Sequence, residues 1–293
     1  MLTLGASAAG AQAPAAGPIA LFLPASTRAV AEGNAWVAGR DEFVVFYNSA
    51  QITSASGASL RLARYGPATG VATLAAGQAV GPLNIGWGTQ LVDTHLPVAA
   101  PYPFTVDGLV RDGTRATLSV AAVVAGNYSY RGFRVGAGAT YATDRVTDTS
   151  SLVGAAPGTG GLLGDIGLSR SLLGGTAALA WRNLSLAHER TPPRQASLGW
   201  ARSLPAGPFD LAVIGGVTRR GRWTGGGGGG ELSLSWIEGW SVAARAGARR
   251  AEATNQRGLS AGFALTGDRL GVEYAADLLR DGRAIHDLTL RWR

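Results

Sequence analysis

Apolar side chains fall on every second residue through most of this 293-residue chain. In residues 240–248, for example, Trp, Val and three Ala alternate with Ser, Ala, Arg and Gly. Successive side chains of a β-strand point to opposite faces of the sheet, so this alternation predicts strands with one apolar face. No apolar row with a period of 3.6 residues persists over the length of a helix. We therefore expect an all-β fold.

The alternating segments are long for a soluble protein. Most extend over about 9–12 residues, which is the length that a tilted strand needs to cross a bilayer, whereas strands of soluble sandwiches are usually nearer 5–6 residues. Several end in an aromatic residue, as in the aromatic girdles of outer-membrane barrels. The predicted strands are 57–65, 68–79, 83–91, 115–126, 132–143, 162–172, 175–184, 195–204, 208–219, 231–237, 240–249, 258–267, 269–279 and 284–292.

The connections alternate in length from the third predicted strand onward. The long ones are 92–114, 144–161, 185–194, 220–230 and 250–257. The short ones are 127–131, 173–174, 205–207, 238–239 and 268. Bacterial barrels have short periplasmic turns, long external loops and an even number of strands. Residues 57–293 are thus predicted to form a transmembrane antiparallel β-barrel of about 14 strands.

The composition suits such a barrel. Only 15% of residues are charged, 44 are Gly, and Cys is absent, which excludes disulfides and thiolate chemistry. No segment is a candidate helical span, because the uncharged stretch before Arg28 is interrupted by Pro14, Pro18 and Pro24. The net charge of +7 comes from Arg residues scattered along the chain, not from a patch that would bind nucleic acid.

The face opposite the apolar row is expected to line the lumen. It carries charges of both signs on neighbouring strands, which are placed to pair across the lumenal wall. The predicted lumenal charges are Arg245, Arg249, Glu273, Asp277, Asp287 and Arg291.

The first 13 residues are expected to be the remnant of a signal peptide. They are small and apolar and end in Ala11-Gln12-Ala13, an A-x-A cleavage pattern, although they contain no Lys or Arg. The alternative is a plain Ala/Gly-rich tail.

Residues 28–52, RAVAEGNAWVAGRDEFVVFYNSAQI, carry a family resemblance. They are similar to the N-terminal signature of the PorV/PorQ-like outer-membrane proteins, within the superfamily of the long-chain fatty-acid transporter FadL. The final segment 285–292, which contains His286, resembles the closing strand of that family. Ser49 replaces a usual Pro, and Arg293 follows the position where barrels commonly end in an aromatic residue. The matching residues are Arg28, Ala29, Gly33, Ala35, Ala38, Asp41, Glu42, Phe46, Tyr47, Asn48, Ala50 and Ile52.

The resemblance implies an N-terminal hatch inside a fourteen-strand barrel. A barrel of that size is wider than the eight-strand barrels that side chains can fill, so a plug over residues 14–56 is physically reasonable. The alternative is a soluble periplasmic arm. The predicted hatch residues are Arg28, Gly33, Asp41, Glu42 and Asn48.

Residues that would support catalysis are sparse. The three His are not at metal-ligand spacing, and we expect no enzyme, no metal and no cofactor, with His286 beside a Ser as the nearest approach to a hydrolase. The run 225–230 lacks the Lys-Ser/Thr of a phosphate loop and is predicted to be an external loop. Neighbouring side chains are predicted to be solvated at the membrane rim, or alternatively to contact anionic headgroups. These are Arg219, Arg220, Arg222 and Trp223.

Three functions fit the sequence of an outer-membrane barrel from a Gram-negative-type bacterium. The first is a plugged conduit for small or hydrophobic solutes. The second is a docking or shuttle component of a type IX-like secretion system, with the loop 92–114 as the docking surface. The third is a purely structural barrel. The expected partners are the lipid bilayer, with lipopolysaccharide or secreted cargo as further candidates, and no nucleic acid.

Overall fold

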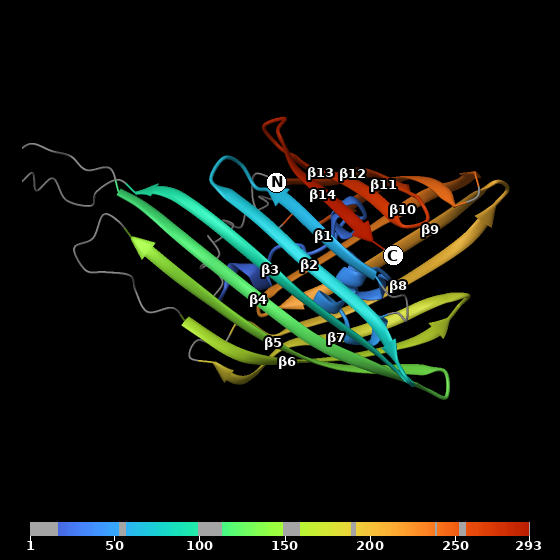
Figure 1. The fold of residues 1–293 in the computed structure, drawn as a ribbon, viewed down its shortest axis with the longest axis horizontal. Helices are drawn as coiled ribbons and strands as arrows, with labels where there is room; N and C mark the ends of the chain where they lie inside the picture. The colour runs from blue at the N-terminus through green and yellow to red at the C-terminus, as the bar shows by residue number, and fades with distance from the viewer. Residues whose placement is uncertain are drawn as a thin grey trace, which may run out of the picture.

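Fourteen antiparallel strands form one closed barrel in the computed structural model, which describes residues 17–52, 57–98, 113–148, 159–188, 192–237, 239–251 and 256–292. Each strand pairs with its neighbours in the sequence, and β1 closes the barrel against β14 (Figure 1). The prediction of an all-β barrel with fourteen strands is confirmed. The predicted signal-peptide remnant, residues 1–13, lies outside the described residues.

The strands differ in length, from eight residues in β1 to eighteen in β4. Their bounds are β1 Gly57–Arg64, β2 Thr69–Val80, β3 Leu83–Val98, β4 Gly113–Tyr130, β5 Phe133–Asp148, β6 Thr159–Leu172, β7 Gly175–His188, β8 Gln195–Ala206, β9 Phe209–Arg220, β10 Trp223–Ile237, β11 Trp240–Arg249, β12 Gln256–Thr266, β13 Leu270–Leu279 and β14 Ala284–Trp292.

The two ends of the barrel have different connections. At one end, which we call the short-turn end, adjacent strands are joined by tight turns such as Arg131-Gly132 and Leu173-Gly174. Both residues of each pair have positive φ, between 49° and 80°, as type I′ hairpins require. The opposite, long-loop end includes the connections 99–112 and 149–158, which lie outside the described residues. The strands next to these loops extend farther than predicted, because polar residues continue the ladder beyond the apolar row.

One predicted loop is wrong. Residues 225–230 were expected in an external loop, but they lie inside β10, and only Gly221 and Arg222 connect β9 to β10. Backbone pairing is continuous through the glycine run, with Gly228 opposite Gly215. Six residues without side chains show no apolar alternation, so the pattern that revealed the other strands was absent here.

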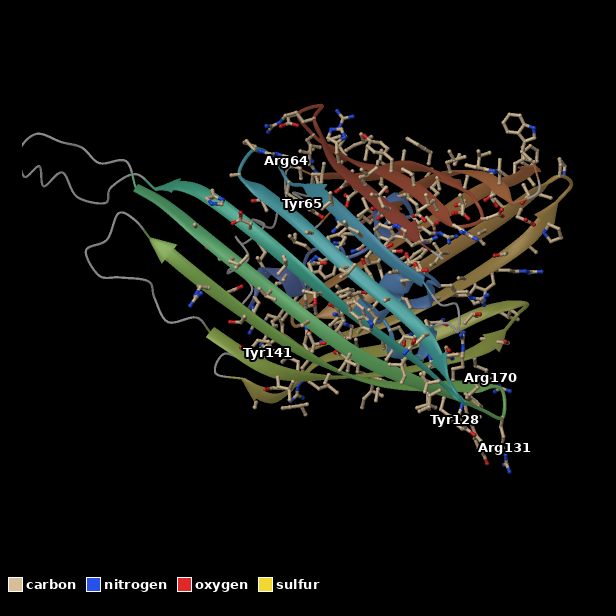
Figure 2. All side chains as sticks on the ribbon, viewed as in Figure 1. Arg64, Tyr65, Tyr128, Arg131, Tyr141 and Arg170 are labelled. Atoms are coloured by element: carbon tan, nitrogen blue, oxygen red, sulfur yellow. The ribbon has the colours of Figure 1, made fainter. Side chains whose placement is uncertain are left out.

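The apolar face of each strand points away from the lumen. On β14, Leu288 and Leu290 are 40% and 38% exposed, whereas the intervening Thr289 is 1% exposed. Figure 2 shows Tyr128 near the short-turn end and Tyr141 farther toward the other end of the barrel. An outward apolar surface with aromatic residues near its limits is typical of a barrel wall in contact with lipid.

Residues 17–52, which we call the hatch, occupy the lumen (Figure 1). Its elements are η1 Ile19–Leu21, α1 Thr27–Ala31, η2 Trp36–Ala38, η3 Glu42–Phe46 and η4 Ser49–Gln51. Ser26 caps α1 by accepting a hydrogen bond from the backbone N–H of Ala29 at 3.1 Å. Gly33 and Asn34, both with positive φ, turn the chain after α1. Within the described residues, no helix has the length and apolar character needed to span a membrane.

A charge on the outward face tests this orientation. Replacing Leu288, in the middle of β14, with Arg is expected to cost about 2–4 kcal/mol of folding free energy in lipid vesicles, because the charge would enter hydrocarbon. Leu270→Arg, at the first residue of β13 near the short-turn end, is the matched control and is expected to cost at most about 1 kcal/mol. Urea unfolding followed by Trp fluorescence measures both, and equal costs would contradict a lipid-facing β14.

Candidate functional site

Ion pairs join the hatch to the wall formed by β10–β14. Arg28 of the hatch contacts Glu32 at 3.1 Å (Nε–Oε1) and Glu231 of β10 at 2.9 Å (Nη2–Oε1). Arg245 of β11 contacts the other oxygen of Glu231 at 2.5 Å, and its Nη1 lies 2.9 Å from Oε2 of Glu273 on β13. These side chains are largely buried, so each charge depends on its partners to offset the loss of hydration.

The ion-pair network continues to the two strands that close the barrel, β14 and β1. Arg291 of β14 contacts Glu273 at 3.0 Å and Glu42 of the hatch at 3.1 Å. Glu42 also accepts a hydrogen bond from Ser59 of β1 at 3.0 Å. The hatch is therefore bound to both strands that close the barrel, by an ion pair to β14 and by a hydrogen bond to β1.

A second group of charges lies beside the first. Arg249 contacts Asp277 at 2.5 Å, and Asp287 pairs with Arg61 of β1. Arg61 also donates a hydrogen bond to the carbonyl oxygen of Pro24 in the hatch at 2.8 Å. All six predicted lumenal charges thus lie in these two groups. Arg61 and Glu231 were not singled out from the sequence; the inward position of Arg61 in β1, opposite Thr289 of β14, was the available signal.

The remaining predicted hatch residues hold its internal turns. Asp41 accepts hydrogen bonds from Ser26 Oγ at 2.7 Å and from Trp36 Nε1 at 2.9 Å. Asn48 donates to the carbonyl oxygen of Val37 at 2.9 Å. Burial raises the pKa of Asp41 and of Glu32 above the usual carboxyl range, although nearby Arg side chains oppose the shift. The direction of the pKa shift of these carboxyls is therefore determined by their packing inside the hatch.

Hydrogen bonds tie the hatch to the opposite wall. Asn127 of β4 donates to the carbonyl oxygens of Ser49 and Ile52 at 3.1 and 2.8 Å. Gln90 of β3 donates to the carbonyl oxygen of Ala20 at 2.9 Å. Because these bonds reach the backbone of the hatch, they position its chain independently of its side chains.

Glycines of the wall let the hatch backbone approach closely. A Cβ on Gly227 of β10 would overlap the carbonyl oxygen of Gly33, and one on Gly247 of β11 would lie 2.5 Å from the carbonyl carbon of Glu32. On the opposite wall, a Cβ on Gly136 would overlap the backbone of Ser49 and Ala50. The abundance of Gly in the barrel thus follows in part from a hatch packed backbone against backbone.

Two cavities lie on opposite sides of the hatch, against the same wall sector of β7–β9. The cavity toward the long-loop end has a volume of about 80 Å³, and that toward the short-turn end about 440 Å³. The first is lined by residues that include Phe22, Tyr47, Trp223, Arg182 and Arg220. The second is lined by residues that include Arg28, Arg40, Arg202, Thr176 and Ile214.

Trp36 lines both cavities and separates them. The guanidinium of Arg28 lies 5.3 Å from the centre of its ring, and Asp41 holds its indole nitrogen. Its neighbour Val37 fills the remaining space against the wall, since a Cβ on Gly199 of β8 would overlap its side chain. The hatch therefore closes the sector of β7–β9 with the side chains of η2, without the ion-pair network found on the other side.

One further prediction requires correction. Arg220 and Trp223 were placed at the membrane rim, but they point inward, where Arg220 stacks on Phe22 at 4.9 Å and on Trp223 at 5.4 Å. The two-residue turn 221–222 folds these side chains over the lumen. His286 lies on the outward face, where its Nδ1 is 2.6 Å from the hydroxyl of Tyr274.

Comparisons with known proteins support the fold. No family model matches the chain, and no curated protein matches it by sequence. Among solved structures, the Pseudomonas putida toluene transporter TodX is similar, with a TM-score of 0.55, 10% identity, and coverage of 88% of this chain and 92% of that chain. A TodX deltaS2S3 mutant, described as a monoaromatic hydrocarbon channel, gives a TM-score of 0.55, 10% identity, and coverage of 94% and 97%. CdiB from Escherichia coli gives a TM-score of 0.50, 10% identity, and coverage of 80% and 62%. At these identities the similarity establishes the barrel architecture.

The glycine contacts predict unequal effects from neighbouring substitutions. Gly227→Ala is expected to destabilise the protein by about 1–3 kcal/mol, because the added methyl group overlaps Gly33 of the hatch. Gly226→Ala, on the outward face of the same run, meets its nearest atom at 3.3 Å and is expected to cost much less. Urea unfolding in detergent measures both variants. A Gly227→Ala protein as stable as the Gly226→Ala protein would show that the hatch does not press on β10.

Proposed function

We propose that this chain is an outer-membrane channel of a Gram-negative-type bacterium, through which small solutes pass along the β7–β9 wall. The observation that carries the proposal is the pair of cavities against this wall, separated by Trp36 and Val37. Charges and hydrogen bonds hold the hatch on its other sides, so a change at η2 opens a route while the rest of the hatch stays in place.

The lining supports solutes with an apolar part. Phe22, Trp36, Tyr47 and Trp223 line the cavity at the long-loop end. The fold resembles that of the toluene transporter TodX, which is consistent with passage of an aromatic compound. The lining also contains Arg182 and Arg220, so the route is more polar than one for hydrocarbons alone.

A FadL-related, PorV/PorQ-like kinship is the finer part of the proposal. Residues 28–52, which carry that resemblance, are the residues that form most of the hatch. Under this proposal the bilayer is the partner of the outward face, with lipopolysaccharide around the long-loop end, and the chain is a channel and not an enzyme. The alternative role in type IX-like secretion stays a prediction, because most of its expected docking loop, 99–112, lies outside the described residues.

Liposome swelling tests passage directly. Trp36→Ala is expected to increase the swelling rate in small sugars or aromatic amino acids several-fold, because it removes the side chain that separates the two cavities. Trp236→Ala is the control, since Trp236 is 76% exposed on the outward face. Equal swelling for both variants and the parent chain would favour the purely structural barrel and would contradict the proposed route.

A further inference from the structure

Three arginines lie on the outward face of β4–β8 at the short-turn end of the barrel. Arg131 is in the turn between β4 and β5, and Arg170 and Arg202 lie near the ends of β6 and β8. Arg170 lies on the same face of its strand as the exposed Ile166, and Arg202 on the same face as the exposed Leu198. Figure 2 shows Arg131 and Arg170 together at this end. Positive charge is therefore presented to the surroundings of the barrel.

Two of these arginines lie over aromatic rings of the same outward face. The guanidinium of Arg131 is 5.1 Å from the ring centre of Tyr130, and that of Arg170 is 4.6 Å from the ring centre of Phe133. Tyr130 lies opposite Phe133 in the sheet, and Phe133 lies opposite Arg170, so these side chains form a continuous row across β4, β5 and β6. A guanidinium held over a ring keeps its N–H donors for another partner.

Trp200 and Arg202 extend this row to β8. Arg170 lies opposite Ala177 of β7, and Ala177 lies opposite Trp200, whose indole nitrogen donates to a backbone carbonyl oxygen of β6 at 3.1 Å. The guanidinium of Arg202 lies against the turn between β6 and β7, since a Cβ on Gly174 would be 3.2 Å from its central carbon. Arg202 therefore lies at the edge between the outward row and the larger cavity.

This sector contains no negative charge to balance the three arginines. None of the three forms an ion pair with a described residue of the chain. The turn between β12 and β13, at the same end, differs because it places Asp268 beside Arg269. The segments at the short-turn ends of β2–β8 contain no Asp or Glu, and these segments are 76–88, 125–136, 166–178 and 198–206. The imbalance favours an anion from outside the chain as the partner of these arginines.

A turn of this sector also exposes a large apolar side chain. Leu173, between β6 and β7, is 77% exposed and has a φ of 53°. Positive φ is uncommon for a residue with a bulky side chain, and exposure of Leu to water is unfavourable. A lipid interface around the turn removes the second of these costs. Leu173 therefore indicates that this end of β6 and β7 lies where acyl chains meet headgroups, which is also the level of the three arginines.

We propose that this basic-aromatic patch, formed by Arg131, Arg170 and Arg202 with the rings of Tyr130, Phe133 and Trp200, binds the headgroup of an anionic phospholipid. Guanidinium groups bind phosphate through paired hydrogen bonds, and the acyl chains would lie along the apolar outward face of β4–β8. Short turns mark the periplasmic side of bacterial barrels, so the lipid belongs to the periplasmic leaflet. The bilayer around the barrel rests on the proposed function, whereas the preference for a negative headgroup is a separate claim.

Native mass spectrometry of the full chain in detergent tests the patch by titration with dioleoyl-phosphatidylglycerol, which is anionic, and with dioleoyl-phosphatidylcholine, which is zwitterionic. The parent chain is expected to bind the anionic lipid more tightly. In an Arg131→Gln/Arg170→Gln/Arg202→Gln variant, affinity for phosphatidylglycerol is expected to fall about tenfold or more, because each Arg near an anionic lipid contributes to the attraction. Affinity for phosphatidylcholine is expected to stay as in the parent.

Arg64→Gln/Arg257→Gln/Arg280→Gln is the matched control. It removes the same charge from the outward face at the long-loop end, where each of these arginines is exposed and donates to a backbone carbonyl oxygen. This variant is expected to bind phosphatidylglycerol as the parent does. A heat-dependent shift in gel mobility shows whether each variant has kept its folded barrel.

Equal affinity of the parent chain for the two lipids would overturn the patch, and so would an unchanged affinity for phosphatidylglycerol in the folded patch variant. An equal loss in the two triple variants would also contradict it, because binding would then follow the total charge of the chain. None of these results bears on swelling by the Trp36→Ala variant. Failed lipid discrimination with increased swelling leaves the channel, and lipid discrimination without swelling leaves the patch on a barrel that does not conduct.

Discussion

A barrel of fourteen strands encloses more space than its own side chains fill, and this constraint shapes the rest of the molecule. In hydrocarbon, every backbone donor and acceptor of the wall must find a partner, and closing β1 on β14 achieves that. Closure leaves a wide lumen, which the chain fills with its own N-terminal segment. The hatch brings backbone against wall, and the wall accommodates it with glycines such as Gly227 and Gly136.

The hatch is attached unevenly. Toward β1 and β10–β14 it is held by buried ion pairs centred on Arg245, Glu273 and Arg291. Toward β3 and β4 it is held by side-chain amides that bind its carbonyl groups. Toward β7–β9 the main contacts come from η2, and both cavities lie there. Such ion pairs contribute little to net stability, because the cost of dehydrating each charge offsets much of the attraction.

The period-two pattern was sufficient to predict the architecture, because lipid on one side and a polar lumen on the other impose alternation on each strand. The pattern failed at residues 225–230, because glycines show no apolar alternation. The start of β10 was therefore not predicted, and neither were the inward positions of Arg220 and Trp223. The inward positions of the lumenal charges could be predicted from the alternation of side chains along each strand alone. Their partners on the hatch did not, because side-chain periodicity carries no information on how two separate segments pack. The cavities depend on that packing and needed the structure.

The central claim is that residues 17–52 lie inside the barrel, and a cross-link tests it most directly. The hydroxyls of Thr27 in the hatch and Thr289 on the lumenal face of β14 are 2.8 Å apart, and the chain has no Cys of its own. Thr27→Cys/Thr289→Cys is predicted to form an intramolecular disulfide in the membrane under mild oxidation. Thr27→Cys/Leu290→Cys, with the second Cys on the outward face, is predicted not to. Absence of the first cross-link, or equal yields for the two pairs, would contradict a hatch inside the lumen.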